Sequence, residues 1–239
     1  MSAQPGLFAL IGAGPSLDYC STEIQHLISR RAHFFISDSV AAGFLKLWRP
    51  ERASIFTVEA RRHTYLNRIG RGADCVILAY QGSNPRNLRF TTDRVVSHFR
   101  LTGEVGNLPA LYSPGTVFGT MLSCAVALSA ENAASEIHLL GADLFYLDNQ
   151  VYSRLIDSHT PHVNRLQSRE LWQYEIVLKR STELIARSGF GIRTSLEFLR
   201  ARQNMRDYTQ QISANIHLIE YSPLGIDSPR VEKRIPARS

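Results

Sequence analysis

The sequence predicts an α/β fold: a doubly wound, mainly parallel Rossmann-like sheet with a helical C-terminal part. Short apolar runs that suit strands buried on both faces alternate with segments of helical spacing along all 239 residues. Several of these runs end in glycine or an acidic residue. With 44% hydrophobic and 20% charged residues, the composition is that of a globular protein with a sizeable core.

The N-terminal half begins with the apolar run Leu7 to Ile11, which predicts a buried parallel strand. A helix is expected next, because Ile24, Leu27 and Ile28 recur at helical spacing. The following elements are expected to be a strand (33–36), a helix that stops before Pro50 (40–47), a strand (54–58), a helical segment (65–69) and a strand (75–79).

The C-terminal half is expected to start with an irregular region rich in loop formers, at residues 81–107. The elements after it are a strongly apolar helix (116–130), a strand (136–140), a polar stretch long enough for a lid or binding loop (148–167), two long helices (168–187 and 195–211) and a last strand (216–219).

The domain organisation that follows from this order is simple. We expect residues 1–228 to form a single Rossmann-like nucleotide-binding domain, in which the late helices between 168 and 211 form a lid or subdomain. The segment 229–239 carries four basic residues and one acid, and is expected to be a solvated basic tail.

Charge and cysteine content narrow the function classes. A net charge of +6 favours anionic partners, such as nucleotides, nucleic acids or a membrane surface. The longest apolar stretch, 116–130, is too short to span a bilayer, and no secretory signal is visible, so we expect a cytoplasmic protein. The three cysteines lack CxxC spacing, which argues against a disulfide framework or a zinc site and for reduced, buried thiols.

Polar residues follow four of the expected strands, and this is the strongest functional signal. Gly12-Ala13-Gly14, Asp38, Glu59 and Asp143 stand at strand ends. In open α/β sheets, ligands bind in the crevice outside the carboxyl ends of the strands. All four groups are therefore expected to face one crevice.

The Gly-rich loop predicts a nucleotide site. Gly12 and Gly14 permit a tight turn and close approach of a ligand, and Pro15 and Ser16 lead into a helix whose N-terminal amides attract phosphate. The alternative is a tight strand-to-helix turn without a ligand, since the motif is neither GxGxxG nor a P-loop. Asp143, Asp38 and Glu59 would bind a ribose hydroxyl or Mg²⁺, or else cap helices.

Further candidates lie beside these strand ends. Tyr146 and Tyr152 have hydroxyls that would donate to a leaving phosphate, or else pack in the interior. The loop histidines His159 and His162 are candidate general bases, with solvated histidines as the alternative. Arginine suits phosphate recognition, which makes Arg61, Arg62 and Arg154 candidate substrate residues. Glu59, at the end of the strand before Arg61, is a further candidate substrate residue.

Two motifs in this order carry a family resemblance. Gly12-Ala13-Gly14-Pro15-Ser16-Leu17 after a strand, and the segment Ile137 to Leu144 with Gly141-Ala142-Asp143, resemble the MptE-like family. That family contains archaeal 6-hydroxymethylpterin diphosphokinases and the catalytic region of the flagellin-modifying motility accessory factors. The resemblance covers about residues 7–152. It implies nucleotide-binding roles for the loop, for Gly141 and Asp143, and for the start of the apolar helix at Ser113, Gly115 and Thr116.

The same motifs are similar to those of bacterial sialyltransferases that use CMP-sialic acid. Tyr146 and Tyr152 have the spacing of the two tyrosines that hold the leaving phosphate in those enzymes, and residues 158–162 resemble the segment with the histidine base. His162 is preferred over His159. The sialyltransferase loop has Asn where this chain has Ala13, and a basic residue where it has Leu111.

Three hypotheses remain open. The first is a glycosyltransferase-like enzyme that moves a sugar, of the CMP-linked nonulosonic acid type, to an acceptor hydroxyl without a metal. The second is a 6-hydroxymethylpterin diphosphokinase that uses ATP, with Mg²⁺ held by Asp38, Glu59 or Asp143. The third is a nucleotide-binding module without catalysis. A nucleotide or nucleotide-sugar is the expected partner, nucleic acid is not favoured, and a homo-oligomer is left open.

Overall fold

The computed structural model describes residues 6–57, 66, 69, 75–80, 96–99, 125–126, 129–130, 133–148, 150–156, 177, 183–187 and 190–236. Within these residues the first elements in chain order are β1 (Leu7–Ile11), η1 (Pro15–Tyr19), α1 (Ser21–Ser29), β2 (His33–Ser37), α2 (Asp38–Leu47), β3 (Ala53–Thr57), β4 (Val76–Tyr80) and β5 (Val96–Phe99). The later ones are β6 (Glu136–Leu140), β7 (Tyr146–Leu147), β8 (Glu183–Arg187), β9 (Phe190–Thr194), α5 (Leu196–Gln211), β10 (His217–Tyr221) and β11 (Val231–Arg234).

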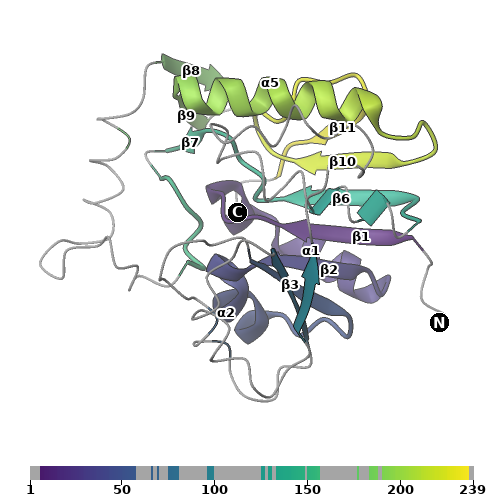
Figure 1. The fold of residues 1–239 in the computed structure, drawn as a ribbon. Coiled ribbons are helices and arrows are strands. Elements are labelled where there is room, and N and C mark those ends of the chain that lie inside the picture. The colour runs from purple at the N-terminus through teal and green to yellow at the C-terminus, as the bar shows by residue number, and fades with distance from the viewer. Residues whose placement is uncertain are drawn as a thin grey trace, which may run out of the picture.

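An eight-stranded parallel sheet forms the centre of the molecule (Figure 1). Its order is β11-β10-β6-β1-β2-β3-β4-β5, and every neighbouring pair is parallel. From β1 the chain adds strands outward to β5, and then continues on the other side of β1 with β6, β10 and β11. The strand order therefore reverses between β1 and β6, which is the topological switch point of a doubly wound fold. The predicted fold class is confirmed.

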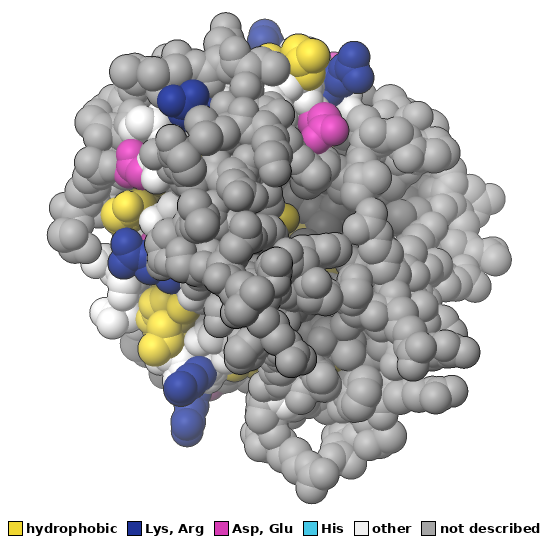
Figure 2. Space-filling view, turned by 90° about the vertical axis from the view of Figure 1, so that its left-hand side faces the viewer, with side chains coloured by type: hydrophobic (Ala, Val, Ile, Leu, Met, Phe, Trp, Pro, Cys, Tyr) yellow, Lys and Arg dark blue, Asp and Glu magenta, His cyan; other side chains and the backbone are white. Residues whose placement is uncertain are grey.

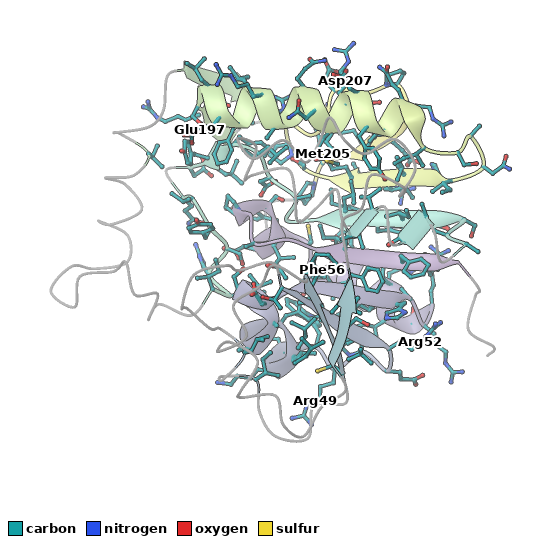
Figure 3. All side chains as sticks on the ribbon, viewed as in Figure 1. Arg49, Arg52, Phe56, Glu197, Met205 and Asp207 are labelled. Carbon is teal, nitrogen blue, oxygen red and sulfur yellow. The ribbon has the colours of Figure 1, made fainter. Side chains whose placement is uncertain are left out.

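Both faces of this sheet are covered, which explains the continuous apolar run of β1. Phe8 and Leu10 point into one core cluster, together with Met205 of α5. Ala9, between them in sequence, points to the opposite face and into the cluster that contains Phe44 of α2. In Figure 3, Met205 lies on the side of α5 that faces the sheet, whereas Asp207 lies on the outer side. Alternate residues of the strand thus belong to different core clusters, one containing residues of α5 and the other residues of α2.

The helical C-terminal part is only partly as expected. Helix α5 agrees with the predicted helix 195–211, and Ser195 caps it by accepting a hydrogen bond from the Phe198 amide. The helix expected over 168–187 is wrong at its end, because Glu183–Arg187 forms β8. This strand pairs antiparallel with β9, and β9 pairs with β7, in a separate three-stranded sheet.

The reason for this error is visible in the sequence. Arg187 pairs with Phe190, so only the two residues Ser188 and Gly189 connect the strands. A two-residue connection with glycine is a hairpin signal. The run Glu-Leu-Ile-Ala-Arg before it consists mostly of good helix formers, and this favoured the helix interpretation.

The basic tail expected from residue 229 is also wrong in its first part. Val231–Arg234 forms the edge strand β11, in parallel register with β10. Val231 is buried in the core, whereas the next three side chains, Glu232, Lys233 and Arg234, are exposed. Charged residues are common on edge strands, where they oppose further strand pairing, and they gave this segment the appearance of a tail.

Strand β5 lies within the region 81–107 that was expected to be irregular. Cys20 and Cys75 are buried free thiols, as expected, and burial raises the pKa of Cys20 above its ordinary value. None of the helices in the described ranges combines the length and apolar character that a membrane span requires.

Candidate functional site

The loops after β1 and β6 meet at the switch point, on the edge of the sheet where the parallel strands end. The amide of Gly12 donates to the Leu140 carbonyl at 2.8 Å, and the amide of Gly14 donates to the Gly141 carbonyl at 2.8 Å. Figure 2 views the molecule from this side, and described basic, acidic and apolar side chains are visible on the left and at the top of the view. The predicted convergence of the Gly-rich loop with the loop of Asp143 is therefore present in the structure.

Steric crowding explains why both loops carry glycine. A Cβ atom on Gly12 would collide with the carbonyl oxygen of Gly141, and one on Gly14 would lie 2.5 Å from Oδ2 of Asp143. Gly141 has φ +62, a left-handed conformation that favours glycine. Close packing of one loop on the other, independent of any ligand, thus already requires small residues here.

Asp143 is the central polar group of this contact. Its Oδ2 atom accepts a hydrogen bond of 2.6 Å from the Ser16 amide, and its Oδ1 atom accepts one of 3.3 Å from the Ser222 hydroxyl. Burial raises the pKa of Asp143 to about 6, although the hydrogen bonds from Ser16 and Ser222 oppose the rise. Asp143 therefore joins the ends of β1, β6 and β10.

Two residues of this cluster were missed by the sequence analysis, Glu220 and Ser222. Glu220 lies in β10 and is 1% exposed, and burial raises its pKa to about 7. Ser222 follows the same strand, and its hydroxyl contacts both Asp143 and the Gly225 amide. The available signal was an acidic residue inside an otherwise apolar strand, followed by a Ser-Pro pair at the strand end.

A second polar cluster holds Arg154 next to the Gly-rich loop. Asp18 in η1 accepts hydrogen bonds from the Ser153 hydroxyl, at 2.5 Å, and from the Arg154 amide, at 3.0 Å. The Ser153 amide donates to the Ala13 carbonyl at 2.9 Å. The Arg154 side chain is 76% exposed, and its Nε atom lies 3.7 Å from the Asp18 carboxylate. The backbone at Arg154 is thus fixed while its guanidinium reaches solvent at the edge of the site.

The two tyrosines predicted to hold phosphate occupy different environments. Tyr146 lies in β7 and is 2% exposed, and its ring packs against Phe198 with the centroids 4.9 Å apart. Tyr152 is half-buried and packs against both core clusters of the main sheet. Packing accounts for the position of Tyr146. The phosphate-binding roles of both residues stay predictions.

Asp38 stands at the carboxyl end of β2, as predicted, and is the first residue of α2. It is buried, and its Oδ2 atom accepts a hydrogen bond of 2.6 Å from the Thr57 hydroxyl at the end of β3. Asp38 therefore ties together the ends of two neighbouring strands. Within the described parts of the chain, no group of three or more His, Cys, Asp or Glu residues could hold a metal ion.

The other predicted site residues lie outside the described residues, and their roles stay predictions. They are Glu59, Arg61, Arg62, Ser113, Gly115, Thr116, His159 and His162.

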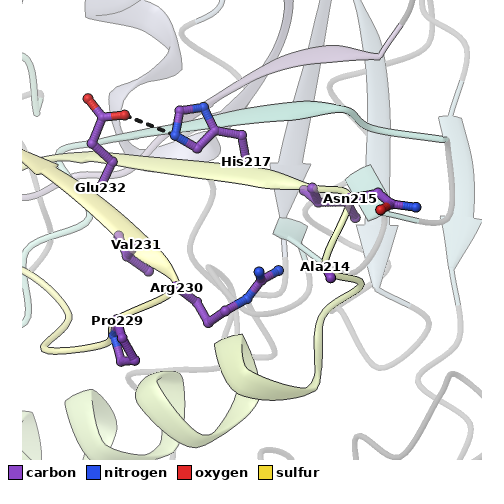
Figure 4. A pocket seen from close by; sticks show the side chains of 8 residues that line it. Ala214, Asn215, His217, Pro229, Arg230, Val231 and Glu232 are labelled. Atoms are coloured by element: carbon purple, nitrogen blue, oxygen red, sulfur yellow. Dashed lines mark ion pairs between the residues drawn. The ribbon is translucent and has the colours of Figure 1, made fainter.

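A groove of about 360 Å³ lies elsewhere, at the start of β10 and β11 (Figure 4). His217 and Glu232 form an ion pair of 2.9 Å across its lining, and Arg230 belongs to the same groove. Since these residues begin parallel strands, the groove lies at the edge opposite the Gly-rich loop. The fold rule does not favour it as the ligand site.

Comparisons with known proteins identify a shared fold. No family model and no curated protein sequence matches this chain. Among solved structures, the MAf glycosyltransferase from Magnetospirillum magneticum AMB-1 aligns with a TM-score of 0.56 and 14% identity over 98% of this chain. The two proteins share a fold. This chain spans 34% of the length of that protein.

Proposed function

We propose that this chain is a glycosyltransferase-like enzyme that binds a nucleotide-activated sugar and transfers the sugar to an acceptor hydroxyl. The observation that carries the proposal is the junction of the Gly12–Ser16 loop with the Gly141–Asp143 loop at the switch point. A glycine-lined junction at this place suits close approach of a nucleotide. The fold likeness to a protein named as a glycosyltransferase supports the choice of reaction.

The described residues suggest how the nucleotide is held. The Ser16 amide already donates to Asp143, so we expect the phosphates to lie beside this amide and not on it. Arg154 lies next to the Gly-rich loop, where the hydrogen bond from its amide to Asp18 fixes its backbone. Its exposed guanidinium suits a phosphate. The Asp143 carboxylate keeps the two loops together and offers its remaining acceptor capacity to a sugar or ribose hydroxyl.

The finer assignment follows the sialyltransferase resemblance. The donor is a CMP-linked sugar of the nonulosonic acid type, His162 takes the proton of the acceptor, with His159 as the other candidate, and tyrosine hydroxyls stabilise the leaving phosphate. Tyr152 fits this last role better than Tyr146, because the Tyr146 ring lies in the core. The transfer needs no metal ion.

Release of CMP from CMP-sialic acid tests this proposal. The protein is incubated with the donor in excess EDTA, and free CMP is measured by chromatography. We expect release by the wild type, loss of release in His162→Ala, and normal release in His217→Ala, whose exposed histidine lies in the groove at the opposite edge. Release that requires Mg²⁺, or that both variants retain, would contradict the proposed mechanism.

A pterin diphosphokinase is the alternative that one observation favours. Asp38 and Asp143 both stand at carboxyl ends of strands on the same edge, where Mg²⁺-ATP would bind. This reaction would convert ATP to AMP with 6-hydroxymethylpterin, and only with Mg²⁺. Production of AMP under those conditions, without turnover of CMP-sialic acid, would support it. Nucleotide binding without either turnover would indicate a non-catalytic module.

A further inference from the structure

The segment between β10 and β11 folds back onto a buried carboxylate. Glu220, inside β10, accepts a hydrogen bond on Oε2 from the Ile226 amide. Gly225 has φ +67, and a Cβ atom there would lie 2.7 Å from the same Oε2 atom. Arg202 of α5 donates from Nε to the Gly225 carbonyl at 3.1 Å. Glu220 and Arg202 thus fix the middle of this segment from two sides.

The same segment reaches the Gly-rich loop through Ser222. The Gly225 amide donates to the Ser222 hydroxyl oxygen at 3.1 Å, and that hydroxyl donates to Oδ1 of Asp143. The other oxygen of Asp143 binds the Ser16 amide. Hydrogen bonds and one short stretch of backbone, from Ile226 to Gly225, therefore connect Glu220 to Ser16, across the ends of β10, β6 and β1.

Burial makes this use of a glutamate costly. Its neighbours in the strand, Ile219 and Tyr221, are buried as well, and a carboxyl group in such surroundings is unfavourable unless its hydrogen bonds are made. An apolar side chain at position 220 would avoid the cost but would leave the Ile226 amide without its acceptor. The contact with the Ile226 amide, in the segment between β10 and β11, is therefore what the buried carboxylate provides.

We propose that Glu220 is a positioning residue: it fixes residues 222–226 so that the Ser222 hydroxyl orients the Asp143 carboxylate against the Gly-rich loop. The importance of this for nucleotide binding rests on the proposed function. The geometric relay itself does not, because it concerns the protein without a ligand. The proposal also gives Ser222 a role in the site, because its hydroxyl connects residues 222–226 to the Asp143 carboxylate.

Amide hydrogen exchange of the ligand-free protein tests the relay. We compare wild type, Glu220→Ala, Glu220→Gln and the control Glu232→Gln, an exposed carboxyl on the adjacent strand β11. In Glu220→Ala we expect exchange at the amides of Ile226, Gly225 and Ser16 to accelerate about fivefold, as loss of roughly 1 kcal/mol of local stability predicts. Glu220→Gln keeps an acceptor oxygen and should restore protection at Gly225 and Ser16.

The Phe198 amide, bonded to Ser195 at the start of α5, lies outside the relay and exchanges through local opening of the helix end, so it should not change. If only Ile226 loses protection in Glu220→Ala, Glu220 acts locally and the proposal is overturned. Titration of the same variants with CMP separates this result from the proposed function. Failure of wild type to bind CMP would count against the function, whereas the exchange data would still decide the relay.

Discussion

The Asp143 carboxylate accepts a 2.6 Å hydrogen bond from the Ser16 amide, which lies 127 residues earlier in the chain. This contact fixes the loop after β1 to the loop after β6 at the place where the strand order reverses. It also occupies an amide that the sequence analysis assigned to phosphate.

Stability should depend on pH through Asp143. Its pKa is about 6 in the folded protein, above the value of about 4 in an unfolded chain, so ionisation costs more in the folded state. The contribution of this group is therefore greatest below about pH 4 and is lost as pH rises through about 6. Asp143→Asn removes the dependence.

Urea unfolding of wild type and Asp143→Asn at pH 4, 5, 6 and 7 measures this effect. The free energy of unfolding of wild type, relative to the variant, should fall by about 1–3 kcal/mol between pH 4 and 7. A constant difference between the two proteins over this range would show that the Asp143 carboxyl titrates normally.

The glycines of the loop junction should not tolerate alanine. Gly12→Ala places a methyl group against the Gly141 carbonyl, and we expect it to destabilise the protein by about 2 kcal/mol or more. Gly191→Ala is the matched control, because its Cβ would lie 3.3 Å from one side-chain atom, Oδ1 of Asp148, and should cost less than about 1 kcal/mol. Thermal unfolding compares them; equal losses would refute the steric explanation.

Arg154 should contribute to nucleotide affinity but not to folding. Its guanidinium is 76% exposed, so Arg154→Ala should change the free energy of unfolding by less than about 0.5 kcal/mol. Loss of a phosphate contact should weaken CMP binding about tenfold, and more at low salt. Arg49→Ala removes the same charge from an exposed position before β3 (Figure 3) and should leave affinity unchanged. Equal affinities of both variants would exclude the assigned role.

Tyr146 should behave as a packing residue. Tyr146→Ala removes a buried ring that contacts Phe198, and should cost about 3–5 kcal/mol. Tyr146→Phe retains the ring, so we expect CMP affinity and donor turnover within about twofold of wild type, since burial keeps the hydroxyl from a ligand in this conformation. Loss of turnover in Tyr146→Phe with normal stability would restore the role suggested by the sialyltransferase resemblance.

The sequence was sufficient for the inner strands of the sheet, but not for the edge strands β5 and β11, and for one side of the site. Continuous apolar runs such as Leu7 to Ile11 identify parallel strands, and such strands end at a common edge. The meeting of the Gly12–Ser16 loop with Asp143 could therefore be predicted, because both follow strands of this kind.

The contribution of β10 could not be predicted in this way. Ser222 and Asp143 are in contact only because β10 pairs with β6, and local sequence pattern does not determine which strands are neighbours. A single glutamate in a strand, such as Glu220, is equally compatible with an exposed position. The pairing of β8 with β9 was missed because helix formers outweighed the hairpin signal that Ser188 and Gly189 give in the sequence.

The most direct test of nucleotide binding at the Gly-rich loop is calorimetric titration of the protein with CMP, CTP, ATP and GTP, each in EDTA and in Mg²⁺. The proposed function predicts that CMP or CTP binds in both conditions with equal affinity, and that Arg154→Ala weakens this binding. Binding of ATP alone, and only with Mg²⁺, would contradict the glycosyltransferase proposal in favour of diphosphoryl transfer. Absence of binding by all four nucleotides would contradict the nucleotide site itself.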